Sequence, residues 1–132
     1  MRHPKALAWE ARLKTVFDRL DAELESKYGG TYPLYPSRAP GGLTANPEHS
    51  GLFNVGAVFT PGFGSPTGPG YVVQMQMATL SRVPKEVLER IERDALAFLR
   101  RELPVAFPGK DLRVEREGHS FKIYGDLSLG TV

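Results

Sequence analysis

The sequence predicts an α+β fold: a two-layer sandwich in which two amphipathic helices lie on one face of a four-stranded, mainly antiparallel sheet. Apolar residues recur at spacings of three and four in two long stretches, as on one side of a helix. Apolar and polar residues alternate in shorter stretches, as along strands with one buried face. The order along the chain is helix, hairpin, helix, hairpin, and we expect one domain over residues 1–132.

The first helix is predicted over residues 4–28. Pro4 suits its first turn, because the N–H that proline lacks has no helical partner there. Gly29 and Gly30 follow the last apolar residue and can adopt the left-handed conformation that ends helices. The aromatic and aliphatic stripe of this helix is interpreted as core: Trp9, Leu13, Val16, Phe17, Leu20, Leu24 and Tyr28.

Residues 29–50 have no periodicity and are rich in Pro and Gly. Loops of this length in small domains are usually functional or disordered. Tyr32, Leu34 and Tyr35 alternate with prolines, which predicts an extended segment that lays its aromatic rings across a face of the sheet. We interpret the segment as a covering loop, with a ligand-binding loop as the alternative.

The first hairpin is predicted from strands over residues 52–59 and 71–78. The loop between them, residues 60–70, consists mostly of Gly and Pro. It is not a phosphate-binding loop, because it leads into a strand rather than a helix and no Lys follows it. We expect a flexible tip with several positive φ angles and with Phe63 at its end, where it can close over a ligand.

The second helix is predicted over residues 84–103, with Pro104 ending it. A second hairpin follows over residues 111–126 and turns at Glu117-Gly118. We expect its first strand to pair with the first strand of the chain, which makes the sheet antiparallel throughout.

The sheet face opposite the helices, called the far face below, is the main functional candidate. It is too apolar to be idle and too polar to be core, a mixture typical of interfaces. The residues expected on it are Leu52, Asn54, Gly56, Val58, Val72, Gln74, Gln76, Ala78, Arg113, Glu115, Lys122 and Tyr124. The candidate binding residues on this face and in the loops are Tyr32, Tyr35, Phe63, Gln74, Gln76, Arg113, Lys122 and Tyr124.

Composition narrows the class of protein. There is no Cys, which excludes disulfides and thiolate metal sites and favours a reducing compartment. No apolar run is long enough for a membrane span or a signal peptide, so we predict a soluble, cytoplasmic protein. A net charge of +2 is too small to imply a polyanionic partner.

Motifs for catalysis are missing from the sequence. His3, His49 and His119 have no metal-binding spacing, and there is no nucleophile elbow, phosphate loop or dinucleotide motif. We therefore predict no metal site, no cofactor, and a non-catalytic binding or interaction module that forms a homodimer through the far face.

Two alternatives stay open. One is an RNA-binding domain that uses the open sheet face through Arg113, Arg116, Lys122 and Tyr124. The other is a small enzyme with its site in the Gly/Pro-rich loops, using Glu48, His49 or His119.

Overall fold

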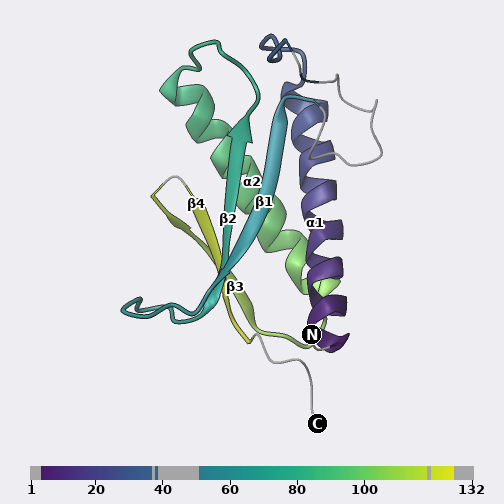
Figure 1. Ribbon diagram of the computed structural model, residues 1–132, viewed down its shortest axis with the longest axis vertical. Coiled ribbons are helices and arrows are strands. Elements are labelled where there is room, and N and C mark those ends of the chain that lie inside the picture. Colours follow the sequence, from purple (N-terminus) through teal and green to yellow (C-terminus); the bar gives the residue numbers. More distant parts are fainter. Residues whose placement is uncertain (1–3, 37, 39–50, 119, 127–132) are drawn as a thin grey trace.

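The computed structural model describes residues 4–36, 38, 51–118 and 120–126. It confirms the predicted order of helix, hairpin, helix, hairpin (Figure 1). The elements are α1 (Pro4–Tyr28), β1 (Phe53–Thr60), β2 (Gly70–Met77), α2 (Lys85–Ala106), β3 (Leu112–Glu117) and β4 (Ser120–Gly125). Both helices lie on the same side of the sheet, which makes the α+β arrangement of two layers.

The sheet has the strand order β1-β2-β4-β3, and every neighbouring pair is antiparallel. The expectation that the third strand pairs with the first is therefore wrong. The physical reason lies in the two strands of the second hairpin. β4 carries Phe121 and Ile123 and is buried in the interior of the sheet, whereas β3 carries mostly charged residues, which an edge strand can leave in water.

The core lies between the helices and the inner sheet face. α1 packs on β1 and on α2, and α2 packs on β3. Phe17, Val73 and Phe98 are all buried, as the helical and strand periodicities predicted. The largest fully buried side chains are Phe53, Phe121, Leu20, Leu24, Leu52, Leu99, Leu103, Ile123, Val16, Val55 and Val73.

Pro104 does not end the second helix, since α2 continues to Ala106. A proline so close to the end removes only the hydrogen bond to the Arg100 carbonyl. Leu103 and Phe107 are buried on either side of it, and the Phe107 N–H donates to the Leu103 carbonyl at 2.9 Å. Packing of these two side chains therefore stabilises the helical turn that follows the proline.

The end of α1 and the segment after it both contact the open end of the first hairpin. Both carboxylate oxygens of Glu25 accept from the Leu52 N–H, at 3.1 and 3.0 Å. The Tyr35 N–H donates to the Ala78 carbonyl at 2.9 Å, just beyond the end of β2. Tyr32 and Leu34 pack against the core, so the described part of this segment does cover part of the fold.

Candidate binding site

The far face is largely open. Over most of its length, the residues expected on this face are exposed or half-buried, as the strand alternation predicted. Val58, Gln74, Gln76, Arg113 and Glu115 are all exposed. Leu52 and Ala78 are exceptions, because both are buried. They lie just outside β1 and β2, where the strict alternation of a strand no longer holds.

A polar groove of about 420 Å³ lies at one end of this face, beside the open end of the β1–β2 hairpin. Asn54 and Gln76 are directly opposite each other on β1 and β2, so their side chains are neighbours on the far face. Tyr35 and Arg38 come from the segment that follows α1. The groove is lined by Tyr35, Arg38, Asn54, Gln76, Met77 and Ala78.

Arg38 is held in place by the backbone of the hairpin. Its Nε donates to the Gly51 carbonyl and its Nη2 to the Phe53 carbonyl, both at 3.0 Å. The Arg38 N–H also donates to the Tyr35 carbonyl at 2.9 Å, which makes a turn between these two lining residues. The guanidinium is thus preorganised rather than free to sample many rotamers.

These groups define what the groove can bind. Side-chain amides donate and accept hydrogen bonds, a guanidinium only donates, and a phenol does both. Arg38 carries the only charge among the described lining residues, so the groove suits a carbonyl or carboxylate oxygen rather than a cation. The Tyr35 ring and Met77 add apolar surface for a flat part of a ligand.

The structure brings together only part of the predicted binding set. Tyr35 and Gln76 line the groove, whereas Gln74 is exposed outside its lining and Tyr32 packs on the core. Phe63 is 93% exposed in the β1–β2 loop.

Two of the predicted residues lie away from the groove on the second hairpin. Arg113 and Tyr124 face each other across β3 and β4. Burial, and then a hydrogen bond to Glu115 and the charge of that carboxylate, raise the pKa of Tyr124.

Four lining residues were not among the predicted binding residues, although Asn54 and Ala78 were expected on the far face: Arg38, Asn54, Met77 and Ala78. Asn54 becomes a neighbour of Gln76 only through the register of β1 and β2, and alternation within one strand does not predict that register. Arg38 had a visible signal, because it is the only Lys or Arg between residues 29 and 50.

Lys122 contradicts the expectation of a solvent-facing residue, since it is only 2% exposed. It lies on the far face, but the β1–β2 loop folds over it. Its Nζ donates to Ser65 Oγ at 3.0 Å, to Thr67 Oγ1 at 2.6 Å and to the Gly68 carbonyl at 2.5 Å. These contacts can occupy all three ammonium hydrogens, so Lys122 acts here as a donor that tethers the loop and not as a base for Ser65.

Glycines allow the loop to take this path. Gly62, Gly64 and Gly68 have φ angles of 74°, 77° and 73°, which confirms the predicted positive φ positions. At Gly70, an added Cβ would lie 2.4 Å from the Ile123 carbonyl oxygen and 3.0 Å from Lys122 Cε. The tip is therefore tethered at its base by Lys122, while Phe63 extends into solvent.

The basic residues expected to bind RNA each have a polar partner in the protein. Arg116 pairs with Glu92 at 2.8 Å, Arg113 lies 3.8 Å from Asp111, and Lys122 is buried. Of the three, only Lys122 is removed from the surface, whereas Arg113 and Arg116 stay exposed in their ion pairs.

The residues of the enzyme alternative, Glu48, His49 and His119, lie outside the described residues, as does His3. Within the described ranges, no three Asp, Glu or His side chains gather closely enough to hold a metal ion. No helix of the described part of the chain is long and apolar enough to cross a membrane.

Fold and groove together describe a small α+β protein with a polar groove on its sheet. A family model described as "Uncharacterised protein" matches residues 4–125. An uncharacterized protein of Borreliella burgdorferi is 35% identical over 106 residues, which cover 80% of this chain and 83% of the relative. The chain belongs to this uncharacterised family. No solved structure matches it.

Proposed function

We propose that the protein is a non-catalytic binding module that holds a small, flat molecule bearing a carboxylate or carbonyl group in the far-face groove. The observation that carries this proposal is a groove lined both by the cross-strand pair Asn54 and Gln76 and by a guanidinium held by two backbone carbonyls. Preorganised polar groups in a hollow lose little entropy on binding, which favours recognition.

Each part of the groove has a distinct role in this proposal. Arg38 attracts the ligand oxygen, and the two amides fix its orientation through donors and acceptors. The Tyr35 ring lies at the exposed rim, where a flat ligand can pack against it. Among the described residues, the groove lining contains hydrogen-bonding groups but no carboxylate, imidazole or thiol, which supports binding without an acid, base or nucleophile of those types.

The proposal is tested with benzoate and benzamide, which share a ring and differ in charge. Titration into isotope-labelled protein, followed by amide chemical shifts, should move Tyr35, Asn54 and Gln76. Benzoate should bind more tightly than benzamide because Arg38 contributes a charge-assisted hydrogen bond. Equal affinities would remove Arg38 from the proposed role.

Gln74 supplies a matched control. It lies on the same strand and face as Gln76 and is also exposed, but it does not line the groove. Gln76→Ala should weaken benzoate binding about three- to tenfold, the loss of one hydrogen bond, and Gln74→Ala should not. Equal effects of the two variants would contradict the proposed site.

The module is also proposed to act in the cytoplasm and as a homodimer. The absence of Cys supports a reducing compartment. Val58 is 65% exposed and faces the half-buried Val72 across the β1–β2 pair, which supports contact between two far faces. Light scattering tests self-association, as described in the Discussion.

A further inference from the structure

The two edges of the sheet differ in how they are protected. β3, at one edge, has the sequence LRVERE, in which charged side chains discourage pairing with another chain. β1, at the other edge, has the sequence FNVGAVFT, without charge or proline. Its register with β2 runs without interruption from Phe53 to Thr60, so no bulge twists the edge away. The sequence and register of β1 therefore contain no charge, proline or bulge that would block strand addition.

The hydrogen bonds identify which backbone groups point outward from β1. The Leu52 carbonyl accepts from the Ala78 N–H at 2.7 Å, so it points toward β2. The next carbonyl, that of Phe53, must point to the outer side, and Arg38 binds it there. By the same alternation, Val55, Ala57 and Phe59 direct their N–H and C=O groups outward. Within the described residues, no hydrogen bond satisfies these outward groups.

An apolar pocket of about 330 Å³ lies beside this edge, between α1 and the inner sheet face. Ala57 points toward α1 and has only a methyl group, which leaves space below the helix. The lining residues are Glu10, Ala11, Leu13, Lys14, Phe17, Gly56, Ala57 and Tyr71. A side chain that entered from the edge would meet mainly Leu13, Phe17 and Tyr71.

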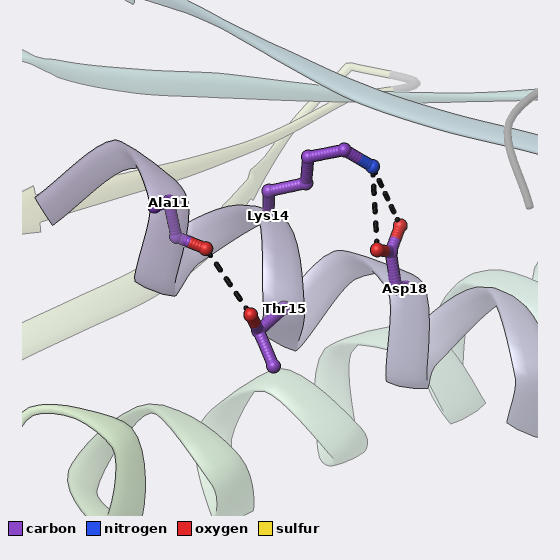
Figure 2. Close-up of polar contacts among 4 residues, drawn as sticks. All are labelled: Ala11, Lys14, Thr15 and Asp18. Carbon is purple, nitrogen blue, oxygen red and sulfur yellow. Dashed lines mark hydrogen bonds and ion pairs between the residues drawn. The ribbon is translucent and has the colours of Figure 1, made fainter. Parts of the chain in front are cut away.

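The charged rim of the pocket is organised along α1 (Figure 2). Lys14 Nζ contacts both oxygens of Asp18, at 3.1 and 3.2 Å, on the side of the helix toward the strands. The Thr15 hydroxyl instead donates to the Ala11 carbonyl at 3.2 Å. Because Lys14 pairs with Asp18, its charge does not dominate the pocket, which favours an apolar side chain.

We propose that β1 binds an extended segment of a partner protein as a fifth strand, with one apolar side chain of that segment in the pocket beneath α1. The partner main chain would bond to the outward groups of Val55, Ala57 and Phe59, a span of about five residues. A side chain such as Leu, Met or Phe fits the apolar lining. This surface is separate from the far-face groove, so the inference does not depend on the proposed function.

A second copy of this chain fits the edge less well than a bare strand does. α1 packs on β1, beside the edge itself (Figure 1). A two-fold pairing of β1 with β1 would set the strands about 4.8 Å apart. The two α1 helices would then overlie adjacent strands, although packed helices need about 8 to 10 Å between their axes. A partner segment without a helix above it avoids this collision.

The test is selection of a heptapeptide phage library on the full chain, followed by binding assays with the selected peptides. We expect peptides with apolar residues at alternating positions. Their binding should shift the amides of Val55, Ala57 and Phe59 and slow the exchange of those amides. N-methylation of the peptide, one residue at a time, should weaken binding at least tenfold at every second position only, which is the signature of strand addition.

Variants on the protein side separate the edge from the pocket. Ala57→Pro removes an outward N–H that β2 does not use, and an edge strand tolerates it. Ala57→Leu fills the pocket but keeps the edge backbone. Both should lose at least tenfold in peptide affinity, whereas the control Val58→Leu, on the opposite face, should bind as the parent does. If Ala57→Pro fails to fold, Ala57→Leu and the N-methylated peptides still test whether the partner segment binds at the β1 edge.

Several outcomes would overturn the proposal. One is no enrichment of peptides over an empty support, and another is an N-methyl series without alternation. Amides of Val55, Ala57 and Phe59 that are already protected in the free monomer would show that the chain covers its own edge. A dimer with the same protected amides would show that a second copy is the occupant.

Discussion

Replacing Lys122 by Met removes a buried ammonium while keeping most of the volume and the apolar stem of the side chain. The ammonium donates to Ser65 Oγ, Thr67 Oγ1 and the Gly68 carbonyl. Hydrogen bonds to a charged group contribute roughly 1.5 to 3 kcal/mol each. Burying the ammonium charge costs several kcal/mol, which offsets roughly half or more of the summed hydrogen-bond contributions. The three acceptors are only half-buried, so water can replace the lysine after the loop opens.

The expected net cost is therefore about 1 to 2 kcal/mol in the free energy of unfolding, measured by urea denaturation. The local effect should be larger, because the lysine tethers the loop more than it supports the core. The Ser65 and Gly68 amides, which donate to the Gly62 and Ser65 carbonyls at 2.9 and 3.2 Å, should lose at least about tenfold in protection from hydrogen exchange.

Lys85→Met is the control for removing a lysine charge, because Lys85 is 86% exposed and should change stability by less than about 0.5 kcal/mol. A loss above about 4 kcal/mol for Lys122→Met would show that the ammonium is part of the global core and not a loop tether. Unchanged exchange of the loop amides would equally refute the reasoning.

Three further predictions concern the core, a half-buried phenol and self-association. Phe98→Ala should cost about 3 to 5 kcal/mol of unfolding free energy because the ring is buried, and a cost below about 1 kcal/mol would contradict the described packing. Burial, and then the hydrogen bond to and charge of Asp94, raise the pKa of Tyr28, so its neutral form stabilises the fold and this stabilisation fades as pH rises above about 10. Tyr28→Phe should thus cost about 1 to 2 kcal/mol at pH 7, with a difference from the parent that shrinks at alkaline pH; a difference that grows there would reverse the assigned sign. In light scattering, the parent should have about twice the monomer mass of 14.6 kDa and Val58→Asp should have that mass, whereas a monomeric parent at high concentration would exclude the far-face dimer.

Local patterns predicted most of the fold. The apolar spacing of α1 and the Gly pair after it predicted the span of the helix. Alternation predicted the buried residues of both hairpins, apart from Phe59 at the end of β1, which is 53% exposed. Pro104 failed as a stop signal because the burial of Leu103 and Phe107, a tertiary effect, outweighed one lost hydrogen bond. The strand order was readable in principle, since the charges of β3 suit an edge and the apolar residues of β4 suit the interior.

The candidate site was harder to predict because it depends on contacts between distant segments. Alternation correctly placed Lys122 on the far face, but it carries no information on the loop that folds over that face. Tyr35 and Gln76 were chosen as separate candidates, and only the path of the segment after α1 brings them to one groove with Arg38. Asn54 joined them through the β1–β2 register.

The most direct test of the binding-module account is a set of intermolecular nuclear Overhauser effects from benzoate to the labelled protein in solution. The account predicts contacts from the benzoate ring to the Tyr35 ring and to the Gln76 side-chain amide, the groups that line the far-face groove. Contacts to Gln74 alone, contacts to Tyr71 in the pocket beneath α1, or no contacts at saturating benzoate would contradict it.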